Sequence, residues 1–363
     1  MYSRLIQCLD ICINLHLYCG ENISLLLEKV SLSELTIQLI TPSGYLKNNR
    51  KEVGLLTLLT FLLLATVLFH TPSEGSNEPK VIGEQKFNFV AAGDFGCSVE
   101  ANSTVSNMVK KNPQVVLALG DLSYERSPNC WLDAISPLDS SGKVKIAFGD
   151  HDMTNELFKY DTYLKHFNLT KPYYSFNHNN VHFLAMATAK NNIIPYAVNS
   201  QQYEFVRNDL KMAHENKSID WIIVYSFRPF YSSNSTHPAE EQLRDFYHSL
   251  FDTYGVDLVL QAHNHNYQRT YPITFNNPSP SYPIISDKQK YNFSNPKAPI
   301  FVTVGTGGAP LYNFSSQSPN TITQFAQYGF LNVDIEKLQK SNTLTGIFYN
   351  NNLNKLDNFT ITK

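Results

Sequence analysis

The chain has 363 residues, of which 42% are hydrophobic and 13% aromatic, and its formal net charge is −2. This length and apolar content allow a sizeable buried core, organised as one large domain or two ordinary ones. Because the chain carries no basic block or stripe, its composition argues against a nucleic-acid partner.

A membrane anchor is predicted near the N-terminus. Residues 53–69 (VGLLTLLTFLLLATVLF) form an uncharged apolar run at the short end of what spans a bilayer. Basic residues precede the run and acidic residues follow it, so the positive-inside rule places the N-terminus in the cytoplasm and the rest outside. A cleaved signal peptide is the alternative, although no A-x-A site follows and the run exceeds a usual h-region. A buried soluble helix is a third interpretation.

The chain therefore divides into four parts. Residues 1–46 show no catalytic pattern; they are either a cytoplasmic amphipathic segment or translated sequence upstream of the true start, and we assign them no function. Residues 47–70 contain the predicted anchor, and the polar residues 71–85, with Pro and Gly, read as a linker. Residues 86–363 form one domain.

Strands and helices alternate through most of this domain. Strands are predicted at 87–92, 115–119, 145–148, 173–176, 181–187, 221–225 and 257–262, and helices at 102–111, 200–216 and 239–254, the last with Leu243, Phe246, Leu250 and Tyr254 on one face. The tail shows only strands, at 300–304, 330–335, 344–349 and 359–362. This order predicts an α/β fold in which two sheets pack face to face with helices outside.

Five short segments, each just beyond or at the end of a predicted strand, carry acidic residues and histidines. They are GDFG (93–96), GDLSY (120–124), GDHD (149–152), VYSFRP (224–229) and AHNH (262–265). The carboxyl ends of strands are where α/β sheets build sites, and carboxylate and imidazole together suit Fe, Zn and Mn. One such segment alone is a common turn; all five in this order indicate a two-metal phosphoesterase.

Over about residues 86–340 the chain resembles the calcineurin-like metallophosphoesterases, and within them the purple acid phosphatases. The family motifs are GDxG, GDxxY, GNH[DE], VxxH and GHxH, and Tyr124 stands at the tyrosine position whose phenolate binds ferric iron in the purple subgroup. The segments 221–234, 257–272 and 302–310 also read like this subgroup. The resemblance implies a four-layer α/β/β/α sandwich of two mixed sheets, here preceded by a transmembrane helix.

The resemblance also implies a role for each motif residue. The first metal, iron, would be held by Asp94, Tyr124 and His265, while Asp121 would bridge to a second divalent ion such as Fe, Zn or Mn, held by Asp150 and His263. A metal-bound hydroxide would be the nucleophile. Asp121, His151 and His237 would act in catalysis: His151 contacts phosphate or protonates the leaving group, and His237 is a second substrate-side histidine or else a surface-loop residue.

Two motifs depart from the family pattern at a metal ligand. Asp150 replaces an asparagine and adds negative charge, which favours a cation and disfavours a phosphate dianion. Phe227 replaces the histidine of VxxH, and a phenyl ring coordinates no metal, so the second metal loses one ligand. The negative charge of Asp150 would partly compensate for the loss of this imidazole. Ala262 for the glycine of GHxH is a milder change. Arg228 reaches either phosphate or a salt-bridge partner on the rim.

The predicted function follows from these features, with alternatives. The first is an exported, membrane-anchored phosphomonoesterase acting on small phosphate esters or polyphosphate; the second is a catalytically degenerate protein that binds metal or phosphate or displays a surface; the last is other chemistry at a single iron. Cys97 and Cys130 either form a disulfide in an oxidising exterior or stay free. The part after the apolar run holds seven N-x-[ST] sequons, which suit export: Asn102, Asn168, Asn216, Asn234, Asn292, Asn313 and Asn358.

Overall fold

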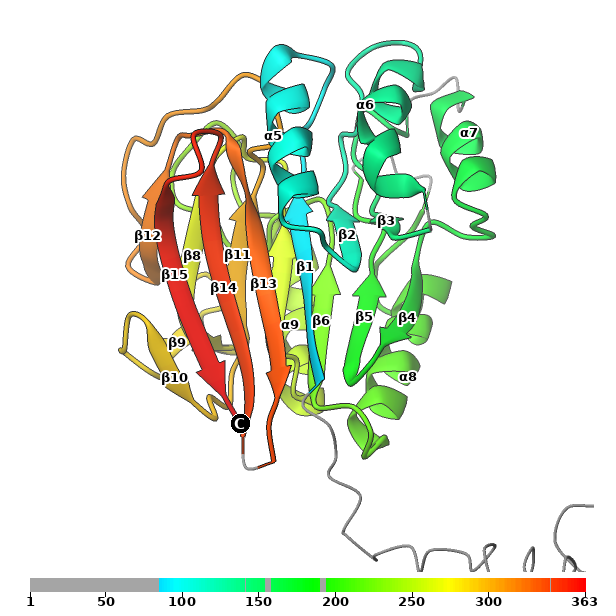
Figure 1. Cartoon of the computed structure of the whole chain (residues 1–363). Coiled ribbons are helices and arrows are strands. Elements are labelled where there is room, and N and C mark those ends of the chain that lie inside the picture. Colours follow the sequence, from blue (N-terminus) through cyan, green and yellow to red (C-terminus); the bar gives the residue numbers. More distant parts are fainter. Residues whose placement is uncertain (1–84, 141, 154–157, 190–193, 340) are drawn as a thin grey trace, which may run out of the picture. The chain divides into compact units, whose positions relative to one another are not determined.

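The computed structural model describes residues 85–363 except 141, 154–157, 190–193 and 340 (Figure 1). The predicted anchor at 53–69, the segment 1–46 and nearly all of the linker lie outside the described residues. Among the helices that are described, none is long and apolar enough to cross a membrane.

The first sheet has seven strands in the order β10-β15-β14-β13-β1-β2-β3. Its strands are β1 (Gln85–Ala92), β2 (Val115–Ala118), β3 (Val144–Ile146), β10 (Asn292–Ser294), β13 (Gly329–Lys337), β14 (Asn342–Asn350) and β15 (Lys355–Thr362). β1, β2 and β3 run parallel, whereas β13 is antiparallel to β1. The three strands that precede the Asp-bearing motifs therefore lie side by side and point the same way.

The second sheet is also mixed. Its strand order is β12-β8-β11-β7-β6-β5-β4, and β9 pairs with β8 beside this path. The strands are β4 (Tyr174–His178), β5 (Val181–Ala185), β6 (Trp221–Tyr225), β7 (Leu258–Gln261), β8 (Tyr267–Thr274), β9 (Ile284–Ile285), β11 (Ile300–Val304) and β12 (Thr321–Phe325). β6 and β7, which precede VYSFRP and AHNH, are parallel neighbours.

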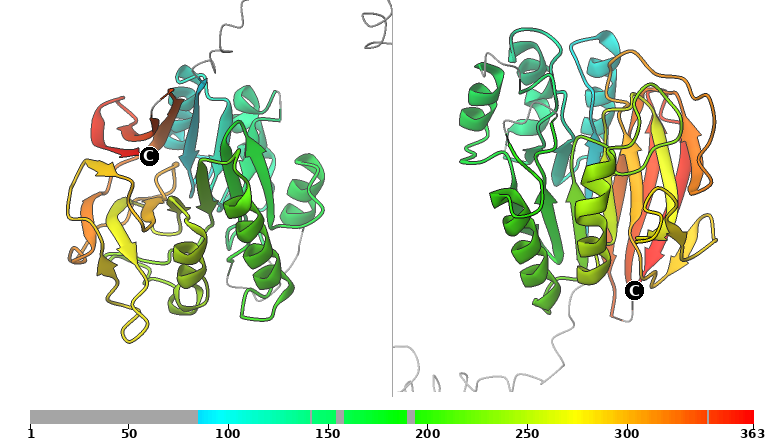
Figure 2. Two further views of the ribbon diagram at one scale, coloured as in Figure 1. Left: turned by 90° about the horizontal axis from the view of Figure 1, so that it is seen from below. Right: turned by 180° about the vertical axis from the view of Figure 1, so that it is seen from behind.

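Five helices flank the sheets in the described part of the chain. α5 (Val99–Lys110) and α6 (Asn129–Asp139) lie on the first sheet's side, with α7 (Phe158–His166) next to α6, while α8 (Gln201–Glu215) and α9 (Glu241–Tyr254) cover the outer face of the second sheet (Figures 1 and 2). The predicted helices at 102–111, 200–216 and 239–254 are confirmed as α5, α8 and α9. α6 and α7 were not predicted; α6 carries a proline in its interior, a residue that disfavours helix.

The main core lies between the two sheets, as the two-sheet prediction requires. Phe89 of β1 meets Phe183 of β5 edge-on at 5.3 Å between ring centroids, and Tyr267 of β8 stacks on Phe348 of β14 at 4.1 Å. A second core fills the space between the second sheet and its helices, with Val224 on the sheet side and Leu210 among the helix residues. Two mixed sheets with helices outside confirm the α/β sandwich.

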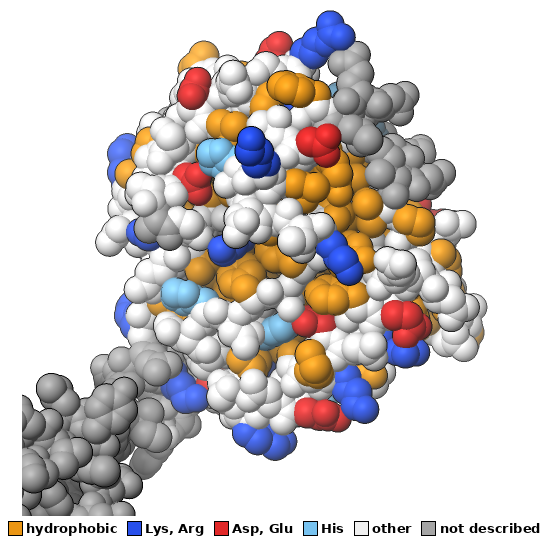
Figure 3. All heavy atoms as spheres, turned by 90° about the vertical axis from the view of Figure 1, so that its right-hand side faces the viewer, with side chains coloured by type: hydrophobic (Ala, Val, Ile, Leu, Met, Phe, Trp, Pro, Cys, Tyr) orange, Lys and Arg blue, Asp and Glu red, His pale blue; other side chains and the backbone are white. Residues whose placement is uncertain are grey.

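The face that carries α7 and α8 is only partly polar. Figure 3 shows apolar side chains gathered near its centre, with charged side chains of both signs scattered around them. Phe158 in α7 and Met212 in α8 are among the exposed large apolar side chains.

Candidate metal centre

The five motif loops meet where the carboxyl ends of the two parallel strand groups come together. The backbone N–H of Asp94 donates to the carbonyl of Gly120 at 3.0 Å, which joins the loops after β1 and β2. The N–H of His263 donates to Asp94 Oδ2 at 2.8 Å, which joins the two sheets. The N–H of Ala262 donates to the carbonyl of Phe227 at 2.9 Å. Hydrogen bonds thus fix the loops to one another.

Three of the candidate metal ligands adopt a backbone conformation that non-glycine residues avoid. The φ angles of Asp94, Asp121 and His263 are +54°, +48° and +70°. Left-handed backbone costs an L-residue about 1–2 kcal/mol, and such residues persist where the surroundings hold them, often at functional sites. Their coincidence at these positions marks the loops as built for the placement of side chains.

Two glycines allow the carboxylates to come close to neighbouring loops. A Cβ on Gly149 would lie 2.2 Å from Asp121 Oδ1, and one on Gly305 would lie 2.5 Å from Asp94 Oδ2. Any side chain at either position would displace the carboxylate.

The three expected ligands of the first metal converge. Tyr124 Oη lies 2.9 Å from His265 Nε2 and 3.1 Å from Asp94 Oδ1, and His265 Nε2 lies 3.4 Å from Asp94 Oδ1. Atoms bound to one ion at about 2.0–2.2 Å stand about 3 Å apart. These three atoms therefore fit a single metal ion.

A hydrogen bond orients the imidazole of this set. His265 Nδ1 lies 2.8 Å from the carbonyl oxygen of Pro310, which can only accept, so Nδ1 carries the proton. Nε2 is then left with its lone pair directed at Tyr124 and Asp94. Metal-binding histidines are commonly held by such a second hydrogen bond.

The charges of the first set also favour a cation. Asp94 and Asp121 are both buried, and burial together with the Asp94 carboxylate raises the pKa of Asp121 well above its usual value. Burial and the same carboxylate raise the pKa of Tyr124 far above that of a free phenol. A bound cation offsets both effects because it stabilises the anionic forms. The residues therefore fit the iron that the resemblance implies.

The expected ligands of the second metal do not converge in the same way. Asp150 is held by Arg228: Nε lies 3.3 Å from Oδ1, and Nη2 donates to Oδ2. Arg228 Nη1 also reaches Glu240 at 3.2 Å. Over the described residues, no three His, Cys, Asp or Glu side chains gather as a metal site would require, and the first set itself contains two such residues beside Tyr124. Of the two roles weighed for Arg228, the structure shows the salt bridge, in which the arginine side chain is buried and its two carboxylate partners are partly exposed.

Phe227 lies where the loop after β6 faces the site. Its side chain is fully buried, and its ring is 4.9 Å from the ring of His263. Its Cδ2 would be only 2.7 Å from a Cβ on Gly120. The phenyl ring is therefore packed tightly between a candidate ligand and the loop that carries Asp121.

His151 lies beside the first set, and His237 lies beside His263, an expected ligand of the second metal. The backbone N–H of His151 donates to Asp121 Oδ1 at 2.8 Å, and its half-exposed ring packs on Tyr124 at 4.5 Å. Partial burial, with Lys159 nearby, lowers the pKa of His151. The ring of His237 stacks on His263 at 4.1 Å, and burial lowers its pKa as well. His237 thus contacts a candidate ligand of the second metal, and its role in catalysis stays a prediction.

Two residues that position the site were not singled out from the sequence. Asp152 accepts hydrogen bonds from the N–H of Leu122 at 3.0 Å and of Gly149 at 2.9 Å, and so ties the GDHD loop to the GDLSY loop. Asn264 donates to the carbonyl of His237 at 2.8 Å and accepts from its N–H at 3.0 Å. The sequence signal that could have found them is their position inside the GDHD and AHNH motifs.

A disulfide joins Cys97 and Cys130, whose Cα atoms are 5.8 Å apart. The sequence left open whether these thiols pair. Cys97 directly follows the GDFG loop and Cys130 lies in the first turn of α6, so the bridge anchors the loop that carries Asp94.

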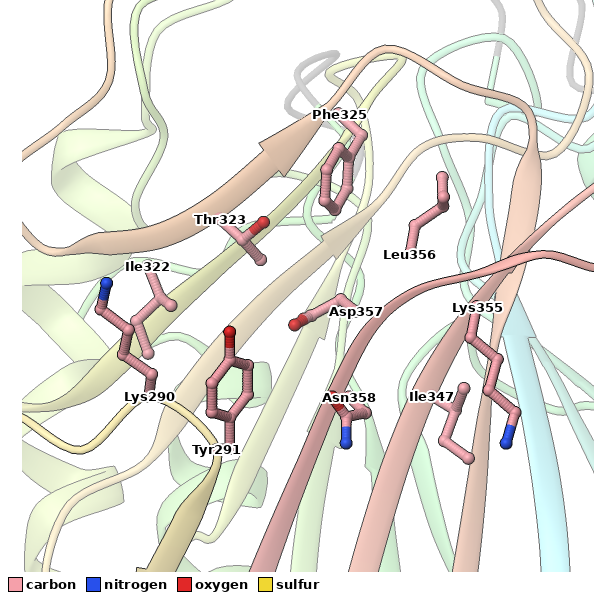
Figure 4. Close-up of a pocket in the computed structure, with 10 residues that line it drawn as sticks. All are labelled: Lys290, Tyr291, Ile322, Thr323, Phe325, Ile347, Lys355, Leu356, Asp357 and Asn358. Carbon is pink, nitrogen blue, oxygen red and sulfur yellow. The ribbon is translucent and has the colours of Figure 1, made fainter.

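A cavity of about 500 Å³ lies away from these loops, between β12 and the β14–β15 pair (Figure 4). Its walls mix apolar side chains, Phe325 and Ile347 among them, with polar ones such as Lys290 and Lys355. The one carboxylate in its lining, Asp357, is paired with the buried Arg269 at 2.6 Å. The cavity thus lacks the converging acids and histidines of the motif loops.

Comparison with known proteins agrees with this geometry. The family model for calcineurin-like phosphoesterases matches residues 87–267. The chain is 28% identical over 264 residues to a phosphoenolpyruvate phosphatase of Allium cepa, covering 66% of this chain and 51% of that protein. It is 26% identical over 255 residues to the Fe(3+)-Zn(2+) purple acid phosphatase 12 of Arabidopsis thaliana, covering 63% and 52%.

A solved structure shows the same fold. Purple acid phosphatase PPD1 from yellow lupin (Lupinus luteus) superposes with a TM-score of 0.64 at 21% identity, covering 77% of this chain and 54% of that one. The chain belongs to the calcineurin-like phosphoesterase family, and its relatives place it with the purple acid phosphatases. It spans about half the length of the curated relatives it matches.

Proposed function

We propose that the chain is a metal-dependent phosphoester hydrolase, similar to acid phosphatases, that cleaves small phosphate monoesters or polyphosphate. The observation that carries the proposal is the convergence of Asp94, Tyr124 and His265 within 2.9–3.4 Å of one another. The purple acid phosphatase relatives support the reaction class.

Each residue of the site has a proposed task. Asp94, Tyr124 and His265 would hold iron, which would supply Lewis-acid stabilisation of charge on the phosphoryl group. His151 is half-exposed beside Tyr124 and is placed to give a proton to the departing alkoxide. Its lowered pKa means that the protonated form prevails only in acid, so this step favours acidic pH. His237, stacked on His263, forms a wall of the substrate site.

The domain is proposed to face the outside of the cell, held to the membrane through residues 53–69. Two features support export. The disulfide between Cys97 and Cys130 suits an oxidising compartment. The asparagines of the seven sequons in the described residues are exposed, whereas several asparagines outside sequons, such as Asn107 and Asn264, are buried.

A catalytically degenerate protein that binds metal or phosphate is the second candidate. The observation that favours it is the state of the second metal position, where Phe227 replaces a ligand and Arg228 holds Asp150. The two candidates share the first metal and differ in turnover.

The test uses the full chain, purified in detergent and loaded with iron in air. Metal analysis and the visible spectrum report the first site, and hydrolysis of p-nitrophenyl phosphate from acid to neutral pH reports turnover. Bound iron with a tyrosinate band and turnover supports the hydrolase. The same band without turnover on any phosphate ester favours the degenerate protein. Failure to bind iron refutes the hydrolase and a metal-binding degenerate protein.

A further inference from the structure

Asp150 and Phe227, which depart from the family pattern, both lie next to Arg228: Asp150 through an ion pair and Phe227 as its neighbour in the chain. Both carboxylate oxygens of Asp150 face the guanidinium of Arg228, through Nε and Nη2. The side chain of Arg228 is only 9% exposed, while those of Asp150 and Glu240 are each 27% exposed. A buried guanidinium needs such partners because taking it out of water unpaired is costly.

This ion-paired group accounts for the exchange of asparagine for aspartate. A neutral amide at position 150 would leave the guanidinium of Arg228 with one carboxylate partner, Glu240, whereas Asp150 supplies a second and matches the planar donor pair with two oxygens. The added negative charge at position 150 therefore stabilises the buried guanidinium of Arg228.

Phe227 leaves little room for an ion beside this pair. Its ring is completely buried against His263 and the backbone of Gly120. His263 in turn is stacked on His237 from another side. The imidazole that would have to turn toward a second ion is thus packed between two rings.

We propose that the Arg228 guanidinium takes the place of the second metal ion, so that this centre binds one metal where its relatives are dinuclear. The inference rests on the proposed function for the first metal only. The Asp150–Arg228–Glu240 group ties the GDHD loop, the VYSFRP loop and the N-cap of α9 together, a cross-link that a second ion would otherwise provide. One cation between two carboxylates leaves a net charge of −1, so the group attracts phosphate less than a divalent ion would.

The test counts zinc bound by the iron-loaded full chain after equilibrium dialysis, using Zn²⁺ as the probe metal. The wild-type chain is expected to retain iron and take up no second equivalent of zinc. Phe227→His alone is expected to take up none either, because Arg228 still occupies Asp150. Adding Arg228→Met and Asp150→Asn to Phe227→His is expected to raise zinc uptake to about one equivalent without change in iron.

A matched control replaces Arg244 in place of Arg228. Arg244 is also buried, but it pairs with Asp245 on α9 and lies over the ring of Tyr231. Phe227→His with Arg244→Met should therefore bind no more zinc than Phe227→His alone. Circular dichroism melts establish that each variant is folded.

Several outcomes overturn the proposal. One is a second tightly bound zinc in the wild-type chain, a result that needs no variant. Others are full zinc uptake by Phe227→His alone, or none by the folded triple variant. Loss of iron from the wild-type chain would instead count against the proposed function, and the dependence of zinc uptake on Arg228 would still decide this inference.

Discussion

Removing the disulfide should weaken the domain by an amount set by the loop that it closes. Cys97 and Cys130 are 33 positions apart. In the chain-entropy treatment, a loop of that length corresponds to a free-energy contribution of about 4 kcal/mol at 25 °C, because the cross-link restricts the unfolded chain. The double substitution Cys97→Ser, Cys130→Ser should lower the free energy of unfolding by roughly this amount.

Urea unfolding of the full chain in detergent measures the change. The chain has two tryptophans, Trp131 in α6 and Trp221 in β6, and both are fully buried. Their fluorescence therefore reports unfolding next to the first sheet and within the second. Linear extrapolation gives the free energy in water. The wild-type chain in reductant should match the double variant, whose own stability should not respond to reductant.

The bridge also bears on the site, because Cys97 directly follows the loop of Asp94. We expect the double variant to retain the tyrosinate band but to release iron to a chelator faster than the wild-type chain. A difference in unfolding free energy below about 1 kcal/mol between the wild-type chain and the double variant would refute the reasoning, since a closed loop of this size contributes more.

Three further substitutions probe the site and its frame. Tyr124→Phe should abolish the visible band and weaken iron binding at least about tenfold, while unfolding free energy changes by about 1 kcal/mol or less; an unchanged spectrum would exclude the phenolate. Gly149→Ala should cost about 1–3 kcal/mol in urea unfolding, because its Cβ would lie 2.2 Å from Asp121 Oδ1; a neutral result would mean that the loop moves freely. Lys363→Met removes the amine 2.6 Å from the buried Asp257 and should cost about 2 kcal/mol at neutral pH. Burial raises the pKa of Asp257 and Lys363 opposes that rise, so the cost should shrink as acid protonates the carboxyl, and a pH-independent cost would contradict this.

The helix α9 illustrates how far sequence periodicity reaches. Its existence and C-terminal end were predicted correctly. Of the expected face, Leu243 is fully buried, whereas Phe246, Leu250 and Tyr254 are only partly buried against the core. The fully buried line passes instead through Leu243, Tyr247 and Phe251, and includes Arg244 and His248. His248 can be buried because the hydroxyl of Tyr231 lies 2.7 Å from its Nδ1, a partner that no helical pattern reveals.

The sequence by itself determined eleven of the fifteen described strands, although not β8, β9, β10 or β12, and the order of the metal motifs. Buried parallel strands read as continuous apolar runs, so β6 and β11 were predicted with their observed bounds. Because carboxyl ends of parallel strands share one edge, the same reading placed Asp94 and Tyr124 near each other.

Only the tertiary structure decided what the altered residues do. The sequence showed that Phe227 cannot bind metal and left Arg228 with two possible roles. The loops after β3 and β6 belong to different sheets, and only the packing of those sheets brings Asp150 to Arg228. Contacts between residues far apart in the sequence depend on this packing, and the local sequence pattern does not predict them.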